Sequence, residues 1–162
     1  MIDAGPVDLV PIDREAAEAV LAGGKPRGLV LGPGFPSPFG LEIAGYAARR
    51  DPDDTSHAHY FIVNTADHAI VGEIGSALDD SGSVQIGYGV TEPCRGRGYA
   101  TAVVVALTAH LQPARVYATV PVDNLASRRV LEKAGFTAGD ESTEDVDGRP
   151  TRIVLYEHAA SR

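Results

Sequence analysis

Apolar and polar residues follow one another along the first third of the chain in a pattern that predicts one strand and two helices. In chain order the predicted elements are a strand at 7–12, a helix at 14–21, a glycine- and proline-rich loop at 23–40 and a helix at 41–50. Asp13 suits the N-cap of the first helix, and Gly23 suits its end. We expect the long loop to be partly rigid and to be available for binding.

The remaining two thirds of the chain read mostly as strands, with two further helices. In order we expect strands at 59–63, 69–78 and 83–90, a helix from 99 that ends before 113, a strand at 115–120, a helix at 124–134, and strands at 136–138 and 152–158. The first three of these strands follow one another through hairpin-like connections, which predicts an antiparallel meander. The pattern as a whole indicates a single α/β domain over residues 1–162.

Composition narrows the function classes. The net charge of −8 argues against a nucleic-acid binder, which needs a basic surface, and mildly favours a cationic or amine partner. Cys94 is the only cysteine, so no internal disulfide can form. The first residues show neither a basic start nor an apolar run, and no segment approaches about 18 apolar residues. We therefore expect no signal peptide, no membrane span and a cytoplasmic location.

The most distinctive turn of the chain joins the strand at 83–90 to the next helix and reads Arg95-Gly96-Arg97-Gly98-Tyr99-Ala100. Free backbone N–H groups at a helix start, the positive end of the helix dipole and two arginines together form an anion site. The turn lacks the Gly-Lys-Ser/Thr ending of a nucleoside-triphosphatase loop and the Gly-x-Gly-x-x-Gly of dinucleotide binders. It predicts a site for a phosphate or pyrophosphate.

Two motifs flank the strand at 115–120. The first is Arg-x-x-Gly-x-Ala, formed by Arg95, Gly98 and Ala100; the second, within 124–136, combines Asn-x-x-Ser with Leu-Glu-Lys-x-Gly-Phe. Together they resemble the signatures of the GNAT superfamily, the Gcn5-related N-acetyltransferases, and are most similar to its Rim-type branch. The resemblance implies a mixed, mainly antiparallel sheet of six to seven strands with helices on both faces.

The resemblance also implies that the turn binds the pyrophosphate of acetyl-coenzyme A (acetyl-CoA). The strand that ends at Val90 would separate from its neighbour and pair with the pantetheine arm, and Asn124 would bond the same arm as well as cap its helix. Arg128 would face either this cofactor or the solvent. The expected cofactor-binding residues are Val90, Arg95, Gly96, Arg97, Gly98, Tyr99, Ala100, Thr101, Asn124 and Arg128.

Two further residues are predicted to carry the chemistry. Glu73 lies among apolar residues of a central strand, where burial would raise its pKa and suit it to accept a proton from an amine. The family often places a tyrosine acid seven or eight residues after the asparagine, but Leu131 and Glu132 stand there; the Rim-type branch suggests Ser127 instead. The alternatives for the base are Glu92, Tyr88 and a water-assisted attack with no dedicated base.

The sequence therefore predicts an N-acetyltransferase that moves an acetyl group from acetyl-CoA to a primary amine, by direct attack in a ternary complex. The acceptor, a protein N-terminus or a small-molecule amine, is left open, as is homodimerisation. No spacing of cysteine, histidine and carboxylate residues suggests a metal site, and we expect Cys94 to be inert. The alternatives are a catalytically inactive CoA-binding sensor or interaction module, and a nucleotide-phosphate binder.

Overall fold

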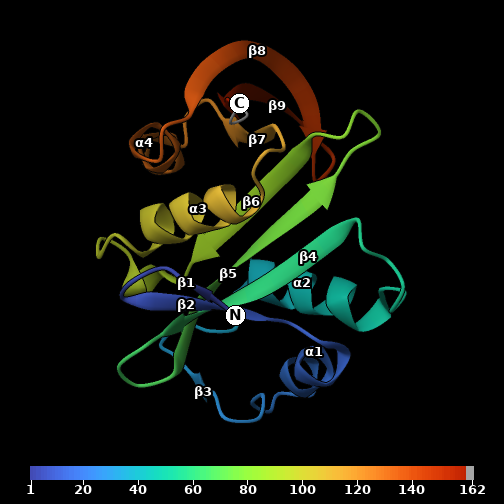
Figure 1. Cartoon of the computed structure of the whole chain (residues 1–162), viewed down its shortest axis with the longest axis vertical. Helices are drawn as coiled ribbons and strands as arrows, with labels where there is room; N and C mark the ends of the chain where they lie inside the picture. The colour runs from blue at the N-terminus through green and yellow to red at the C-terminus, as the bar shows by residue number, and fades with distance from the viewer. Residues whose placement is uncertain (160–162) are drawn as a thin grey trace.

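The computed structural model describes residues 1–159 as an α/β fold built on one sheet (Figure 1). The strands are β1 (Ile2–Asp3), β2 (Val7–Pro11), β3 (Val30–Leu31), β4 (His57–Asn64), β5 (Ala69–Leu78), β6 (Val84–Val90), β7 (Val116–Pro121), β8 (Thr137–Val146) and β9 (Arg149–His158). The helices are α1 (Arg14–Leu21), α2 (Pro38–Arg49), α3 (Tyr99–His110), α4 (Leu125–Lys133) and the short 3-10 helix η1 (Glu92–Cys94). None of these helices is both long enough and apolar enough to cross a membrane.

Within the described residues the sheet has nine strands, more than the six to seven expected from the sequence. The strand order is β1-β2-β4-β5-β6-β7-β9-β8, and β3 pairs with β5 off this path. Among the described strands, only the β3–β5 and β6–β7 pairs are parallel, so the expected mixed, mainly antiparallel sheet is confirmed. The count was too low because β1 and β3 have two residues each, too few to show an alternating pattern.

The helices cover both faces of the sheet, as expected (Figure 1). On one face, α3 and α4 bury Val103, Leu107 and Leu131 against the central strands in one apolar cluster. On the other face, α1 and α2 bury a second cluster that includes Val20 and Ala44. The α3 sequence is apolar on nearly all sides, but only one side of the helix is buried: Val103 and Leu107 face the core, whereas Val105 is exposed.

Two of the differences from the predicted element boundaries have a clear physical reason. Helix α2 begins at Pro38, three residues early, because Ser37 caps it by accepting a hydrogen bond from the Gly40 N–H at 3.0 Å. Strand β8 runs far beyond the predicted 136–138. All ten of its residues are exposed, so it lacks the apolar alternation by which a strand is recognised in a sequence.

Candidate active site

A gap opens in the sheet between β6 and β7, which run parallel. Over residues 1–159, the two strands pair only through Val84 with Val116 and Gln85 with Tyr117, and the remainder of β6 has no strand partner on that side. A cavity of about 530 Å³ lies here, bounded by the end of β6, the turn after η1 and one face of α4. The predicted site residues that line it are Val90, Arg95, Gly96, Gly98, Tyr99, Ala100, Thr101, Asn124 and Ser127.

The turn before α3 presents a run of free hydrogen-bond donors to this cavity. Gly96 and Gly98 have φ angles of 78° and 80°, a left-handed conformation that glycine adopts without strain. The first backbone hydrogen bond of α3 runs from the Ala102 N–H to the Gly98 carbonyl. Over the described part of the chain, the N–H groups of residues 96–101 donate to no other group. Six successive donors at the positive end of a helix are an arrangement that can bind an anion.

Cations reach this cavity from both sides of the gap. Arg95 lines it and donates its Nε–H to the Val90 carbonyl at 3.0 Å, whereas Arg97 is exposed and does not line it. Arg129 and Lys133 of α4 line the opposite wall, and neither was predicted. Their four-residue spacing, which places two side chains on one helix face, was the available sequence signal.

The structure places Arg128 away from the cavity lining, unlike its neighbour Arg129. The Arg128 Nε–H donates to the Tyr156 hydroxyl at 3.1 Å, and Nη1 donates to the Val122 carbonyl at 2.9 Å. Tyr156 in turn donates to the Glu132 carboxylate at 2.8 Å. This network ties α4 to β9, and in it the Arg128 guanidinium contacts Tyr156 and Val122.

The start of α4 brings two predicted residues to the cavity. The Asn124 side chain accepts a hydrogen bond from the Ser127 N–H at 3.2 Å and so caps the helix. Asn124 is exposed and Ser127 is half-buried, and both line the cavity. The cap orients Asn124 without using up the donor capacity of its amide group.

The backbone of β6 directs alternate residues into the gap. The Thr91 N–H donates to the Val71 carbonyl of β5, whereas the Val84 N–H donates to the Arg115 carbonyl beside β7. Because neighbouring residues of a strand point their polar groups to opposite edges, the even-numbered residues of β6 face β7. The N–H of Val90 thus faces the gap, beyond the last residue that β7 pairs.

Glu73 lies behind this gap, on the α2 face of the sheet. It is only 1% exposed, and burial raises its pKa to about 7, although a long contact from the Ser37 hydroxyl (3.4 Å) opposes the shift. Its Oε2 atom has no hydrogen-bond partner among the described residues. A Cβ added to Gly40 or Gly89 would approach the carboxylate oxygens to 3.1 and 3.3 Å. Gly89 also lines the cavity, so the Glu73 carboxylate lies close to the strand that forms the cavity wall.

A ring cluster lies further along the same face, where α2 meets β4. The Tyr46 ring lies 5.0 Å from that of His57 and 5.1 Å from that of His59. Burial, followed by the charge of Arg50, lowers the pKa of His59 to about 4, which keeps this ring neutral at pH 7. The cluster therefore adds three partly exposed aromatic rings, of which that of His59 is neutral, to the face that carries Glu73.

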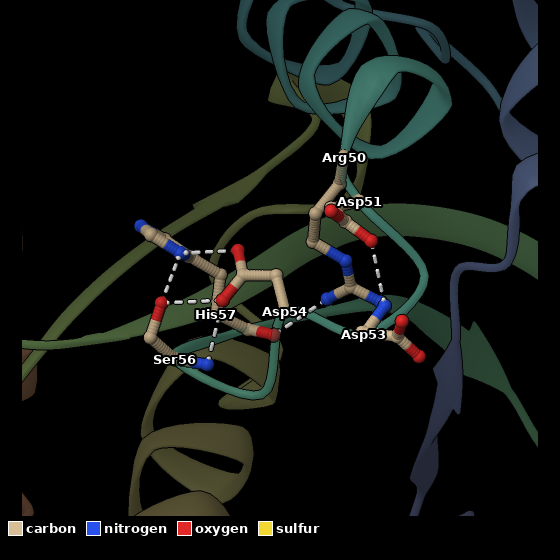
Figure 2. Close-up of polar contacts among 6 residues, drawn as sticks. All are labelled: Arg50, Asp51, Asp53, Asp54, Ser56 and His57. Atoms are coloured by element: carbon tan, nitrogen blue, oxygen red, sulfur yellow. Dashed lines mark hydrogen bonds and ion pairs between the residues drawn. The ribbon is translucent and has the colours of Figure 1, made fainter.

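A polar network fixes the segment that leads into this cluster (Figure 2). His57 Nδ1 lies 3.0 Å from the Asp54 carboxylate and 2.9 Å from the Ser56 hydroxyl. Arg50 donates to the His57 carbonyl at 2.5 Å, and bonds from Ser56 lower the pKa of Asp54 to about 2. The Asp54 carboxylate therefore stabilises the turn that leads into β4. Across residues 1–159, no three His, Cys, Asp or Glu side chains gather as a metal ion would require.

Comparisons with known proteins agree with this geometry. The family model described as an acetyltransferase (GNAT) domain matches residues 9–137. No curated protein sequence matches the chain. Similar solved structures include RimL, a ribosomal L7/L12 alpha-N-protein acetyltransferase in complex with coenzyme A, at 16% identity and a TM-score of 0.73, covering 98% of this chain and 97% of that one.

Two further solved structures share the fold at similar levels. The microcin C7 self immunity acetyltransferase MccE, in complex with acetyl-CoA and AMP, is 17% identical with a TM-score of 0.71, over 95% and 92% of the two chains. A spermidine N-acetyltransferase SpeG variant from Vibrio cholerae is 13% identical with a TM-score of 0.69, over 94% and 93%. At these identities the likeness concerns the fold. Since the family model spans most of its length, the chain belongs to the GNAT family of acetyltransferases.

Proposed function

We propose that this protein transfers an acetyl group from acetyl-CoA to a primary amine, by direct attack in a ternary complex. The observation that carries the proposal is the run of free N–H groups at residues 96–101, which opens onto the cavity between two diverging parallel strands. A pyrophosphate suits such a run because its oxygens accept many hydrogen bonds at once. Arg95, Arg129 and Lys133 add positive charge around the same cavity.

The remainder of acetyl-CoA would follow the gap from this turn towards Val90. Its pantetheine amides would bond the free edge of β6 and the Asn124 side chain. The acetyl thioester supplies the electrophilic carbon. The Val90 N–H would donate to the thioester carbonyl and stabilise the oxyanion that develops during the attack.

Glu73 is our choice for the base. Its pKa of about 7 means that a large fraction of the carboxylate is ionised near neutral pH and can accept a proton from the amine, directly or through one water. The Ser127 hydroxyl, which lines the opposite wall of the cavity, is proposed to assist departure of the thiol. The two groups lie on opposite faces of β6, with the reacting carbon between them.

The acceptor is proposed to be a primary amine, at a protein N-terminus or in a small molecule. The similar structures include an alpha-N-protein acetyltransferase and a spermidine N-acetyltransferase, so the fold accommodates both classes. The net charge of −8 favours the approach of a cationic acceptor. A homodimer is compatible with the proposal but is not needed by it.

An amine panel tests the proposed function. Acetyl-CoA is incubated with the protein and with polyamines, amino acids, aminoglycosides and N-terminal peptides, and release of the free thiol is followed. Amine-stimulated release with a matching acetylated product supports an acetyltransferase. Tight CoA binding without stimulated release across the panel would indicate the inactive sensor instead. Thermal stabilisation by nucleoside triphosphates but not by acyl-CoA would overturn both.

A further inference from the structure

Tyr88 places a hydroxyl group inside the cavity from the strand side. It is half-buried on β6, two residues before Val90, and it lines the cavity together with Ser127. Its hydroxyl reaches across to α4 and donates to the Ser127 carbonyl at 3.2 Å. The contact therefore joins the two walls between which the thioester would lie.

The Ser127 carbonyl does not depend on this contact. Ser127 lies in the first turn of α4, so its carbonyl also accepts the regular helical bond from the N–H four residues on, at Leu131. A carbonyl oxygen has two lone pairs, and the tyrosine hydroxyl occupies the second. Tyr88 can release this partner without leaving a backbone group unsatisfied.

The Tyr88 hydroxyl keeps its proton throughout the physiological pH range. Burial raises its pKa to about 12, with Tyr156 adding a smaller rise and the Ser127 contact opposing it. It cannot act as the base. The thiolate of coenzyme A, whose thiol has an ordinary pKa of about 8.5, is too weak a base to remove this proton completely. The hydroxyl is thus suited to donating a hydrogen bond without transferring its proton.

Resting on the function proposed above, we propose that the Tyr88 hydroxyl turns from the Ser127 carbonyl to the departing sulfur of coenzyme A and stabilises it as a hydrogen-bonded thiolate. The amine nitrogen forms a bond to the acetyl carbon, and the carbon–sulfur bond breaks with its electron pair moving to sulfur. The amine proton goes to Glu73. Tyr88 retains its own proton and contributes only the hydrogen bond.

A substitution of Tyr88 by phenylalanine tests this role in the full chain. We expect Y88F to lower turnover of acetyl-CoA by about 10- to 100-fold, as for the loss of a hydrogen bond to a charged group. The deficit should shrink when the acetyl donor is an analogue with a more acidic thiol, because such a thiolate needs less stabilisation. An equal deficit with both donors, or no deficit, would overturn the proposal in favour of a purely structural tyrosine.

Tyr117→Phe is the matched control. Tyr117 on β7 also donates a hydrogen bond at 3.2 Å, to Asp79, but it does not line the cavity. We expect Y117F to turn over both donors like the wild type. Ser127→Ala keeps the carbonyl and removes the hydroxyl, so it separates the contribution of Ser127 from that of Tyr88.

A binding measurement tests the contact between the Tyr88 hydroxyl and the coenzyme A sulfur even if no amine is acetylated. Free coenzyme A and its desulfo analogue are titrated into the wild type and Y88F between pH 7 and 9.5. The preference for coenzyme A should rise with pH in the wild type, as the thiolate forms, and rise less in Y88F. Both proteins share the other charged and titratable groups near the cavity, so the contributions of these groups to the pH dependence cancel in the comparison. These groups are Arg129 and Lys133 on α4, the Tyr156–Arg128–Glu132 network and Glu73 behind β6. Identical pH dependence in the two proteins would refute the sulfur contact.

Discussion

The two faces of strand β6 differ in how they are built. On the α4 side, the cavity is lined by backbone donors of one continuous turn and by one helix face. Of its lining residues only Cys94 and Tyr99 are buried, and the others are at least partly exposed to solvent. On the α2 side, Glu73 is buried beneath Ser37 and Gly40, which come from a different part of the chain. After the proposed function, we call these the cofactor side and the base side.

This difference separates two kinds of polar group. The donors on the cofactor side remain hydrated until a ligand arrives, so leaving them unpaired within the protein costs little. The Glu73 carboxylate is already desolvated, and the raised pKa of Glu73 reflects the free-energy cost of burying its charged form. Changes on the cofactor side should therefore alter binding, whereas changes on the base side should alter turnover, pH dependence and stability.

The largest effect should come from Glu73→Gln, which removes the proposed base and keeps the shape of the side chain. We expect turnover to fall by about 10²- to 10⁴-fold, the usual contribution of a positioned base, with affinity for acetyl-CoA unchanged. Steady-state kinetics and direct CoA titration measure the two quantities. Glu42→Gln, an exposed change on α2, is the control and should behave like the wild type. Full activity in E73Q would place the base elsewhere or require a water-assisted attack.

The next effect concerns stability, since a raised carboxyl pKa couples folding to pH. The folded protein retains the Glu73 proton up to about pH 7, whereas the unfolded chain releases it near 4.5, so the free energy of unfolding falls as pH rises between these values. The loss is about 3 kcal/mol at pH 8.5 relative to pH 4 or below. E73Q lacks this loss. Its stability relative to the wild type, measured by urea unfolding, should increase from pH 5 to pH 8.5; a constant difference would contradict the pKa shift.

On the cofactor side, Gly98→Ala should weaken binding of CoA by about tenfold, because a Cβ disfavours the positive φ that aims the free N–H groups. Gly82→Ala is a close control: Gly82 has the same φ of 80°, lies in the β5–β6 turn and likewise has no neighbour within 4 Å of an added Cβ. Both changes should cost about 1 kcal/mol of stability. Equal CoA affinity in the two variants would show that the turn does not hold the ligand.

The residues that line the cavity on the cofactor side could largely be predicted from the sequence because their determinants are local. Arg95, Gly98 and Asn124 stand in short motifs, and a glycine-rich turn before an apolar helix exposes N–H groups whatever the rest of the fold does. The central meander was equally accessible: β5 was predicted at 69–78 and spans Ala69–Leu78.

The base side was not accessible in the same way. Glu73 could be suspected from its apolar neighbours, but its face of the sheet depends on the register with Phe61 and Gly89. The contact with Ser37 joins residues 36 positions apart, across a loop whose conformation the sequence does not specify. Arg128 and Arg129 show the same limit on α4, since a small helix rotation decides which of the two faces the cavity.

The smallest effect should come from Ser37→Ala. The Ser37 hydroxyl contacts the carboxylate of Glu73, the proposed base, and also caps helix α2. The Ser37 hydroxyl lowers the pKa of Glu73, so its loss should move the acidic limb of the pH–rate profile to higher pH and leave turnover at pH 9 within about twofold of the wild type. Ser37 also caps α2, and removing the cap costs about 1 kcal/mol. Asp13→Ala removes the corresponding cap from α1, where Asp13 accepts from the Ala16 N–H, and so reproduces the stability cost alone. If D13A moved the pH profile as far as S37A, the shift would reflect general loosening and not the contact with Glu73.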